Sequence, residues 1–305
     1  MDRKVIDTLL AKIEATQTDA GSARIKLIVN RILKDLFYMI EDLDVQPEEV
    51  WTAVNYLTET GKSGEFGLVA AGMGLEHFLD LRMDEAEARQ GVEGGTPRTI
   101  EGPLYVAGAP ESIAEARLDN GNEPGEVLFM QGQVLDDQGK PLAGALVEVW
   151  HANHLGNYSY FDKSQPDFNL RCSIRTDAQG RYRFRSVVPL GYSVPPGGLT
   201  EKLLKQLGRH GTRPAHIHFF VTADGHRKLT TQINIDGDPY LWDDFAFATR
   251  EGLVPAITRI TDPAALKANK VEQPFSSIDF NFMLHTEKKG LPPAEIVRPR
   301  ASVPV

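Results

Sequence analysis

Two histidines that lie one residue apart are the clearest chemical feature of the sequence. The stretch GTRPAHIHFFV, residues 211–221, places His216 and His218 in a segment whose composition is typical of a β-strand. Because side chains alternate across a strand, both imidazoles should point to one face, opposite Ile217 and Phe219. Imidazole is a common metal ligand but also an ordinary surface group. The pair therefore indicates either part of a metal site or a half-polar, exposed strand.

Two imidazoles do not complete a metal site. A cupin-like site would need a carboxylate a few residues later, but residues 219–223 are Phe-Phe-Val-Thr-Ala. The single cysteine, Cys172, excludes a multi-cysteine site and an intrachain disulfide, and we interpret it as a small buried apolar residue. Other histidines follow a strand, or lie in turns, an insertion or a helix, and we interpret them as structural or surface residues. They are His77, His151, His154, His210 and His226.

Tyrosines offer a different way to complete the site. GNYSYFD places Tyr158 and Tyr160 just after a strand, and PLGYSVPPGG places Tyr192 in a constrained loop. A phenol ionises near pH 10, but a bound trivalent cation lowers that pKa sharply. Two phenolates and two neutral imidazoles would suit a ferric ion. A loop tyrosine more often simply packs with its hydroxyl hydrogen-bonded, and spacing does not choose between Tyr158 and Tyr160.

The first third of the chain is predicted to be helical. Apolar residues between 25 and 43 follow the i, i+3, i+4, i+7 pattern. Pro47, followed by two glutamates, is typical of the first turn of another helix. Residues 64–82 predict a third helix that Gly67, Gly72 and Gly74 interrupt. The segment 94–110 is rich in Gly and Pro and should be irregular.

From about residue 127 the apolar period changes to two. Alternating segments at 127–135, 145–150, 181–187 and 276–284 predict half-buried strands. The segment 216–235 predicts two strands joined at residues 223–225, with a helical insertion before them at 200–211. Many short strands with polar turns predict a sandwich or a barrel.

Composition limits the class of protein. A formal net charge of -9 argues against a nucleic-acid partner. No run of eighteen apolar residues is present, and MDRKVIDTLLAKIEA has the charge pattern of an amphipathic helix, not of a signal peptide. We therefore expect a cytoplasmic protein.

Five longer motifs resemble the intradiol ring-cleaving dioxygenases, most closely the catechol 1,2-dioxygenase branch. They are TPRTIEGPLYVAGAP, WHANHLGNYSYFD, PLGYSVPP, GRHGTRPAHIHFFVTADGHRKLTTQIN and DDFAFATREGL. The helical N-terminus is similar too, so the resemblance covers nearly the whole chain. His-x-His alone is a weak signal, whereas two tyrosine motifs followed by RPAHIH in this order are a strong one.

The resemblance implies a mixed, mainly β fold. We expect an antiparallel β-sandwich catalytic domain over residues 101–305 and an α-helical dimerisation domain over residues 1–100. It also implies one non-haem ferric ion per subunit, held by four ligands. These ligands are Tyr158, Tyr192, His216 and His218. No role for Tyr160 follows from the resemblance.

The implied chemistry is insertion of both atoms of dioxygen into catechol, giving cis,cis-muconate. Tyr192 would also take a proton from the substrate, and Arg213 would stabilise charge that develops on the ring. Gln232 would hydrogen-bond within the site. Catechol has little polar surface, so the pocket should be mostly apolar. The family pattern nominates Leu68, Ala71, Ile100, Pro103, Leu104, Phe245 and Ala246, together with Arg213.

The resemblance further implies a homodimer formed through the N-terminal helices. A phospholipid-like amphiphile could occupy that interface, although an ordinary helix–helix core would give the same apolar pattern. Two alternative functions stay open. One is a chlorocatechol or hydroxyquinol 1,2-dioxygenase with the same ligands, and the other is a β-sandwich binding module without catalysis.

Overall fold

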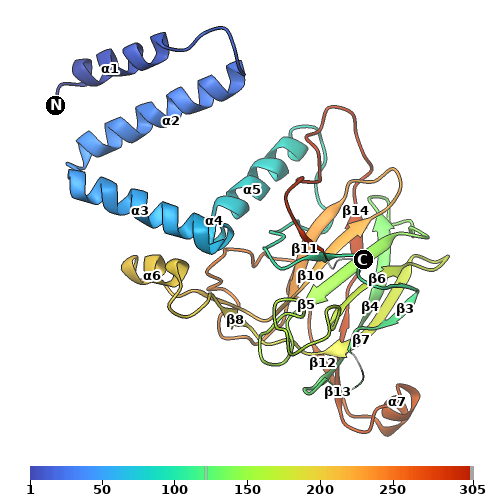
Figure 1. Cartoon of the computed structure of the whole chain (residues 1–305). Coiled ribbons are helices and arrows are strands. Elements are labelled where there is room, and N and C mark those ends of the chain that lie inside the picture. Colours follow the sequence, from blue (N-terminus) through green and yellow to red (C-terminus); the bar gives the residue numbers. More distant parts are fainter. Residues whose placement is uncertain (120, 122, 303–305) are drawn as a thin grey trace. The chain divides into compact units, whose positions relative to one another are not determined.

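The computed structural model describes residues 1–119, 121 and 123–302 (Figure 1). Contacts divide the chain into two compact units, Met1–Gly64 and the remainder from Glu65 onward. The domain boundary that we place at residue 100 marks the change from helices to strands and stays a prediction. None of the helices in the described ranges is both long and apolar enough to cross a membrane.

The first unit consists of three helices with well-defined starts. They are α1 (Arg3–Ala15), α2 (Ala23–Asp42) and α3 (Pro47–Ser63). The Ser22 hydroxyl accepts a hydrogen bond from the Ile25 N–H at the start of α2, and Pro47 occupies the first turn of α3. The helices predicted for residues 25–43 and from Pro47 are therefore present.

Two short helices open the second unit. The predicted helix over 64–82 is divided into α4 (Phe66–Gly72) and α5 (Leu75–Ala88). Gly74 separates them with φ +74°, a left-handed conformation that favours glycine. The predicted insertion forms α6 (Leu199–Gln206), whose first N–H groups donate to the Glu65 carboxylate. A further helix, α7 (Pro263–Ala268), has Asp262 as its N-cap and is not among the elements predicted from the sequence.

Two larger sheets form a sandwich around the main core. One has the strand order β11 (Leu229–Asn234), β10 (His216–Thr222), β5 (Leu146–His151), β6 (Arg171–Arg175) and β2 (Glu111–Ile113). The other has the order β12 (Thr258–Ile260), β13 (Phe275–Asp279), β4 (Val127–Asp136), β7 (Arg181–Val187) and β3 (Glu115–Arg117), and β14 (Phe282–Leu284) also pairs with β4. The largest buried apolar cluster draws residues from both sheets. The predicted β-sandwich is thus confirmed.

Smaller pairings and strand directions add detail that apolar alternation cannot reveal. Two-residue strands pair as β1 (Val106–Ala107) with β15 (Ala301–Ser302), and as β8 (Tyr192–Ser193) with β9 (Thr212–Arg213). The central pairs of the sandwich are antiparallel. Parallel pairs also occur, between β4 and both β13 and β14, between β2 and β6, and between β3 and β7.

The alternating segment 276–284 is broken into β13 and β14 at Phe280 and Asn281. The Phe280 carbonyl turns toward β7 and accepts a hydrogen bond of 2.8 Å from the Tyr182 hydroxyl. It also fills the space beside Gly132, where a Cβ atom would lie 1.7 Å from the Phe280 oxygen. The break therefore depends on a glycine in β4.

Candidate active site

Strand β10 places the two histidines on one face, as predicted. Ile217 and Phe219 belong to the core between the sheets, whereas His216 and His218 lie on the opposite face and are at most 2% exposed. In the sheet register, His218 is opposite Gln232 of β11 and Trp150 of β5. The Trp150 indole stacks on the His218 ring at a centroid distance of 5.0 Å. This packing fixes the orientation of the His218 imidazole.

Two tyrosines from different loops join the histidines. The Tyr158 hydroxyl lies 3.4 Å from Nε2 of His216, and Nε2 of His218 lies 3.0 Å from the same nitrogen. The Tyr192 ring is 5.4 Å from the Tyr158 ring and 5.6 Å from the His216 ring, measured between centroids. Pairing of β8 with β9 holds Tyr192 opposite Arg213. All four predicted ligands therefore come together.

The structure also distinguishes Tyr158 from Tyr160. The Tyr160 ring packs at 5.2 Å from the Phe161 ring, and the Lys163 ammonium lies 4.5 Å from its centroid. Tyr158, which is 4% exposed, is the one that faces the histidines. The sequence spacing alone does not indicate which of the two tyrosines faces the histidines.

The protonation of His216, His218 and Tyr158 determines what these side chains can bind. Nδ1 of His216 lies 2.6 Å from the Pro214 carbonyl, which can only accept, so Nδ1 carries the proton and Nε2 presents a lone pair. Burial lowers the pKa of His216 to about 3 and that of His218 well below its usual value. Burial, followed by the neighbouring Tyr192, raises the pKa of Tyr158 well above 10. The phenol would therefore ionise only beside a strong positive charge.

A metal at this place would need the phenols as ligands. Among the residues that the structure describes, no group of three or more His, Cys, Asp or Glu side chains is arranged to hold a metal ion. Two neutral imidazoles alone leave a ferric charge uncompensated, whereas two phenolates supply hard, anionic oxygen atoms. The converging donors thus fit a ferric ion by number, charge and chemical type.

Arg213 is held beside His216 by three neighbours. Its Nη1 lies 3.1 Å from Nε2 of His216, and its Nη2 donates to Oε1 of Gln232 at 2.7 Å. The same Nη2 also forms an ion pair of 3.0 Å with Asp244. Gln232 in turn donates to Asn234 at 2.9 Å. Arg213 is only 2% exposed, so its charge is fixed in a dry environment.

The sequence patterns predict no role for Asp244. Burial raises the pKa of this carboxyl, but the charge of Arg213 opposes that effect and the net pKa is lowered. The Ala246 N–H also donates to the carboxylate, at 3.0 Å. Asp244 lies in the DDFAFATREGL motif. Its partner Arg213 is 31 residues away in the sequence, so no local spacing predicts that the two residues pair.

The predicted pocket residues are only partly gathered. Ala71, Ile100, Phe245 and Ala246 share one buried apolar cluster, which also contains Val194, Leu204 and Ala248. Leu104 packs on the cluster that contains Tyr158 and Trp150. A Cβ on Gly102 would lie 3.6 Å from the His218 ring, so the segment 100–104 passes close to the histidines. Pro103 is exposed and Leu68 is half-buried, and neither belongs to these two clusters.

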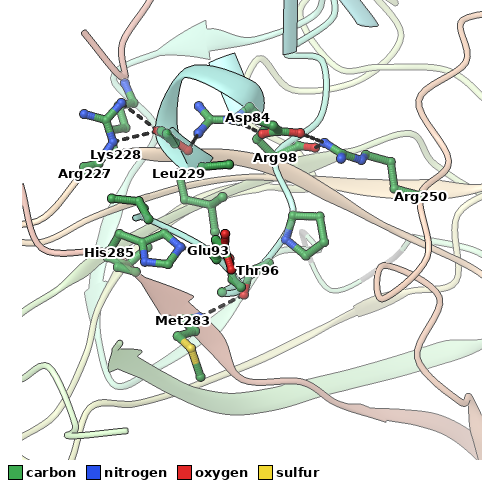
Figure 2. A pocket seen from close by; sticks show the side chains of 17 residues that line it. Asp84, Glu93, Thr96, Arg98, Arg227, Lys228, Leu229, Arg250, Met283 and His285 are labelled. Carbon is green, nitrogen blue, oxygen red and sulfur yellow. Dashed lines mark hydrogen bonds and ion pairs between the residues drawn. The ribbon is translucent and has the colours of Figure 1, made fainter. Parts of the chain in front are cut away.

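A separate pocket lies beside the end of α5 (Figure 2). It measures about 340 Å³, and none of the predicted site residues lines it. Figure 2 shows Arg98 and Arg250 of this pocket paired with Asp84. This internal pairing distinguishes it from the histidine–tyrosine site.

Comparison with known proteins gives the family. Residues 100–286 match the family model described as Dioxygenase, and residues 22–91 match the one described as Catechol dioxygenase N terminus. This chain belongs to the intradiol dioxygenase family. Enzymes of this family are oxidoreductases that use non-haem iron.

Individual relatives align with nearly the whole of this chain. Catechol 1,2-dioxygenase 2 of Acinetobacter lwoffii is 70% identical over 91% of this chain and 100% of its own length. The crystal structure of the wild-type catechol 1,2-dioxygenase of Acinetobacter radioresistens has a TM-score of 0.95 at 54% identity and covers 99% of both chains. A chlorocatechol 1,2-dioxygenase of Rhodococcus opacus is 35% identical over 81% of this chain and 93% of its own. Within the family, similarity is thus greater to the catechol enzymes.

Proposed function

We propose that this chain cleaves catechol between its two hydroxylated carbons with dioxygen, giving cis,cis-muconate in aromatic catabolism by the beta-ketoadipate route. The observation that carries the proposal is the convergence of Tyr158, Tyr192, His216 and His218 beside a buried arginine. The high identity to the Acinetobacter lwoffii enzyme supports catechol as the substrate.

The same four side chains would hold one ferric ion per subunit. Their two phenolates and two neutral imidazoles leave a single positive charge on the centre. When bound, this ion supplies a Lewis acid that withdraws electron density from the catecholate, so that dioxygen can react with the ring.

Tyr192 is the better placed of the two tyrosines to exchange a proton with the substrate. It is partly exposed, whereas Tyr158 is 4% exposed and enclosed by its cluster. The phenolic oxygen of Tyr192 would accept one of the two catechol protons, and a hydroxide ion that enters with the ferric ion would take the other, so no separate carboxylate base is needed.

Arg213 would stabilise negative charge that develops on the substrate. Its guanidinium lies next to His216 and is already oriented by Gln232 and Asp244, so little reorganisation is required during the reaction. Gln232 then acts as a positioning residue through its 2.7 Å hydrogen bond. Apolar residues would complete the site: Leu68, Ala71, Ile100, Pro103, Leu104, Phe245 and Ala246.

Substrate preference tests this proposal against its closest rivals. Ala71 and Ala246 are small beside Leu68, Leu104 and Phe245, so methyl- or chloro-substituted catechols should be accepted, although they should be turned over more slowly than catechol itself. One misplaced methyl group in an apolar pocket is worth about 1–3 kcal/mol. Oxygen uptake and muconate formation should be measured with catechol, 4-chlorocatechol and hydroxyquinol. Tenfold faster use of 4-chlorocatechol or hydroxyquinol would assign the chain to that branch.

The first unit would form the homodimer. Apolar residues of α2 are exposed in the single chain, among them Ile28 at 42%, Ile32 at 57% and Leu36 at 41%. Ile32→Glu should therefore yield a monomer in sedimentation, while Ile113→Glu, at a 75% exposed residue of the second unit, should leave the dimer intact. Equal behaviour of both variants would contradict this interface.

The same apolar α2 surface supports the proposal that a phospholipid-like amphiphile binds at the interface. Organic extraction of the purified dimer should release it. The cytoplasmic location also stays a prediction.

A further inference from the structure

A second cavity in the unit from Glu65 onward contains an unusual carboxyl group. The cavity measures about 240 Å³ and lies between α5, the segment 98–101 and the segment 294–298. Asp80 and Glu76 of α5 line it together with apolar side chains. These apolar residues include Leu75, Leu79, Met83 and Ile296. Leu75 and Ile296 are about half exposed, at 51% and 50%, so the cavity is accessible from solvent.

Asp80 is buried without a partner. It is 8% exposed, and within the described ranges its carboxyl forms no hydrogen bond or ion pair. Asp84, one turn later on the same helix, pairs with both Arg98 and Arg250. A buried, unpaired carboxylate is unfavourable by several kcal/mol in proteins. Asp80 therefore lacks the compensation that its neighbour has.

The cations around the cavity are all paired with carboxylates other than Asp80. Arg98 is engaged by Asp84 and Glu87, and Arg298 is engaged by Glu76 and Glu101. Among the described residues, Asp80 is then the carboxyl of the lining that forms no direct ion pair. The charged groups that act on it are Arg98 and Arg250, which lower its pKa, and Asp84 and Glu76, which raise it. Burial is the largest influence, and the pKa of Asp80 is raised to about 7.

We propose that this cavity binds a small organic cation, whose ammonium group pairs with Asp80 and whose apolar body contacts Leu75, Leu79 and Ile296. A single positive charge would give the ionised Asp80 carboxylate the direct partner that it lacks. A cavity of about 150 Å³ can hold benzene, so the present volume accommodates a single-ring amine. Because Ile100 lines this cavity and also belongs to the apolar cluster of the candidate active site, the ligand would lie next to the proposed catechol pocket.

Calorimetry with benzylammonium tests the site directly, on the full-length, iron-loaded protein at pH 8. One benzylammonium should bind per chain, and the neutral isostere benzyl alcohol should bind at least tenfold more weakly. Lowering the pH to 6 should weaken benzylammonium binding about tenfold, because the ionised fraction of Asp80 falls while the amine stays charged. No binding, or equal binding of both probes, would overturn the proposal.

Two variants test separately the charge of Asp80 and the free volume of the cavity. Asp80→Asn should reduce the affinity for benzylammonium at least tenfold, whereas Asp243→Asn, which removes an exposed carboxylate elsewhere, should leave it unchanged. Ala294→Leu keeps Asp80 but fills part of the cavity, and it should also weaken binding. Wild-type affinity in Ala294→Leu would exclude this cavity even if Asp80→Asn failed to fold. The binding readout does not depend on turnover, so it is independent of the proposed dioxygenase activity.

Discussion

At the scale of single residues, the buried pair of Arg213 and Asp244 should serve both the reaction and the stability of the fold. The two side chains are 3% and 1% exposed, so each charge relies on the other. Removing one partner of such a buried pair typically destabilises a protein by about 3–5 kcal/mol. A loss of activity in a single variant would therefore mix catalysis with stability.

Arg213→Ala should lower kcat by about 10²–10³, because a charge-stabilising donor is lost, while the ferric ion and its colour are retained. It should also lower the free energy of unfolding. Steady-state kinetics, an iron assay and denaturant unfolding on the same preparation measure the three quantities. An iron-free protein would mean that Arg213 holds the site together.

The double variant Arg213→Ala, Asp244→Asn is the matched control. Removal of both charges should recover much of the stability, because no buried charge is left unpaired. The activity should stay low, since the donor is still missing. Recovery of kcat together with stability would show that Arg213 acts only through the fold.

His151 should make stability depend on pH. It is 1% exposed, its Nδ1 donates to the Ala152 carbonyl, and the Ser186 hydroxyl donates to its Nε2. Burial lowers its pKa to about 4 in the folded chain, against about 6.5 in the unfolded chain. Between these values the unfolded chain binds more protons, so the free energy of unfolding falls as the pH decreases from about 6.5 to 4. The loss should be about 3 kcal/mol.

Unfolding of the wild type and of His151→Gln at several pH values isolates this contribution. The variant should show a smaller loss over the same interval, and the difference between the two proteins should level off below pH 4. An identical pH dependence in both proteins would mean that His151 does not carry it.

At the scale of elements, the register of β4 against β13 and β14 depends on Gly132. Gly132→Ala would place a methyl group on the Phe280 carbonyl, which is already bonded to Tyr182. Because backbone, and not a flexible side chain, must move, we expect a loss of about 3 kcal/mol in unfolding free energy. Gly67→Ala in α4 is the control: its Cβ meets nothing within 4 Å, so stability should be unchanged or rise by up to about 1 kcal/mol. Equal effects would refute the steric argument.

Local periodicity predicted most of these elements but not how all of them join. The helix at 25–43 and the strands at 127–135 and 181–187 have regular apolar patterns, and all are present. Helix α7 is too short for such a pattern. The break at Phe280 and Asn281 is set by Tyr182 and Gly132, which lie far away in sequence. Parallel and antiparallel strands show the same alternation, so the directions at the sheet edges could not be predicted.

At the scale of the whole molecule, the candidate site depends on contacts between distant segments. Alternation in one strand placed His216 and His218 on one face, but only the family resemblance selected Tyr158 and Tyr192. The Arg213–Asp244 pair and the stacking of Trp150 on His218 arise from tertiary packing, which single-sequence patterns do not encode. Pro103 and Leu68 belong to neither of the two buried clusters near the site, so their place in the pocket stays a prediction.

The visible absorption spectrum of the purified protein, with an iron assay, tests the central claim most directly. If Tyr158 and Tyr192 bind ferric iron, the protein should contain one iron per chain and show a broad visible phenolate-to-iron charge-transfer band. Tyr158→Phe should remove or shift this band and abolish turnover, whereas Tyr160→Phe, two residues away, should keep both. A colourless wild-type protein that still cleaves catechol would contradict the ferric–phenolate account.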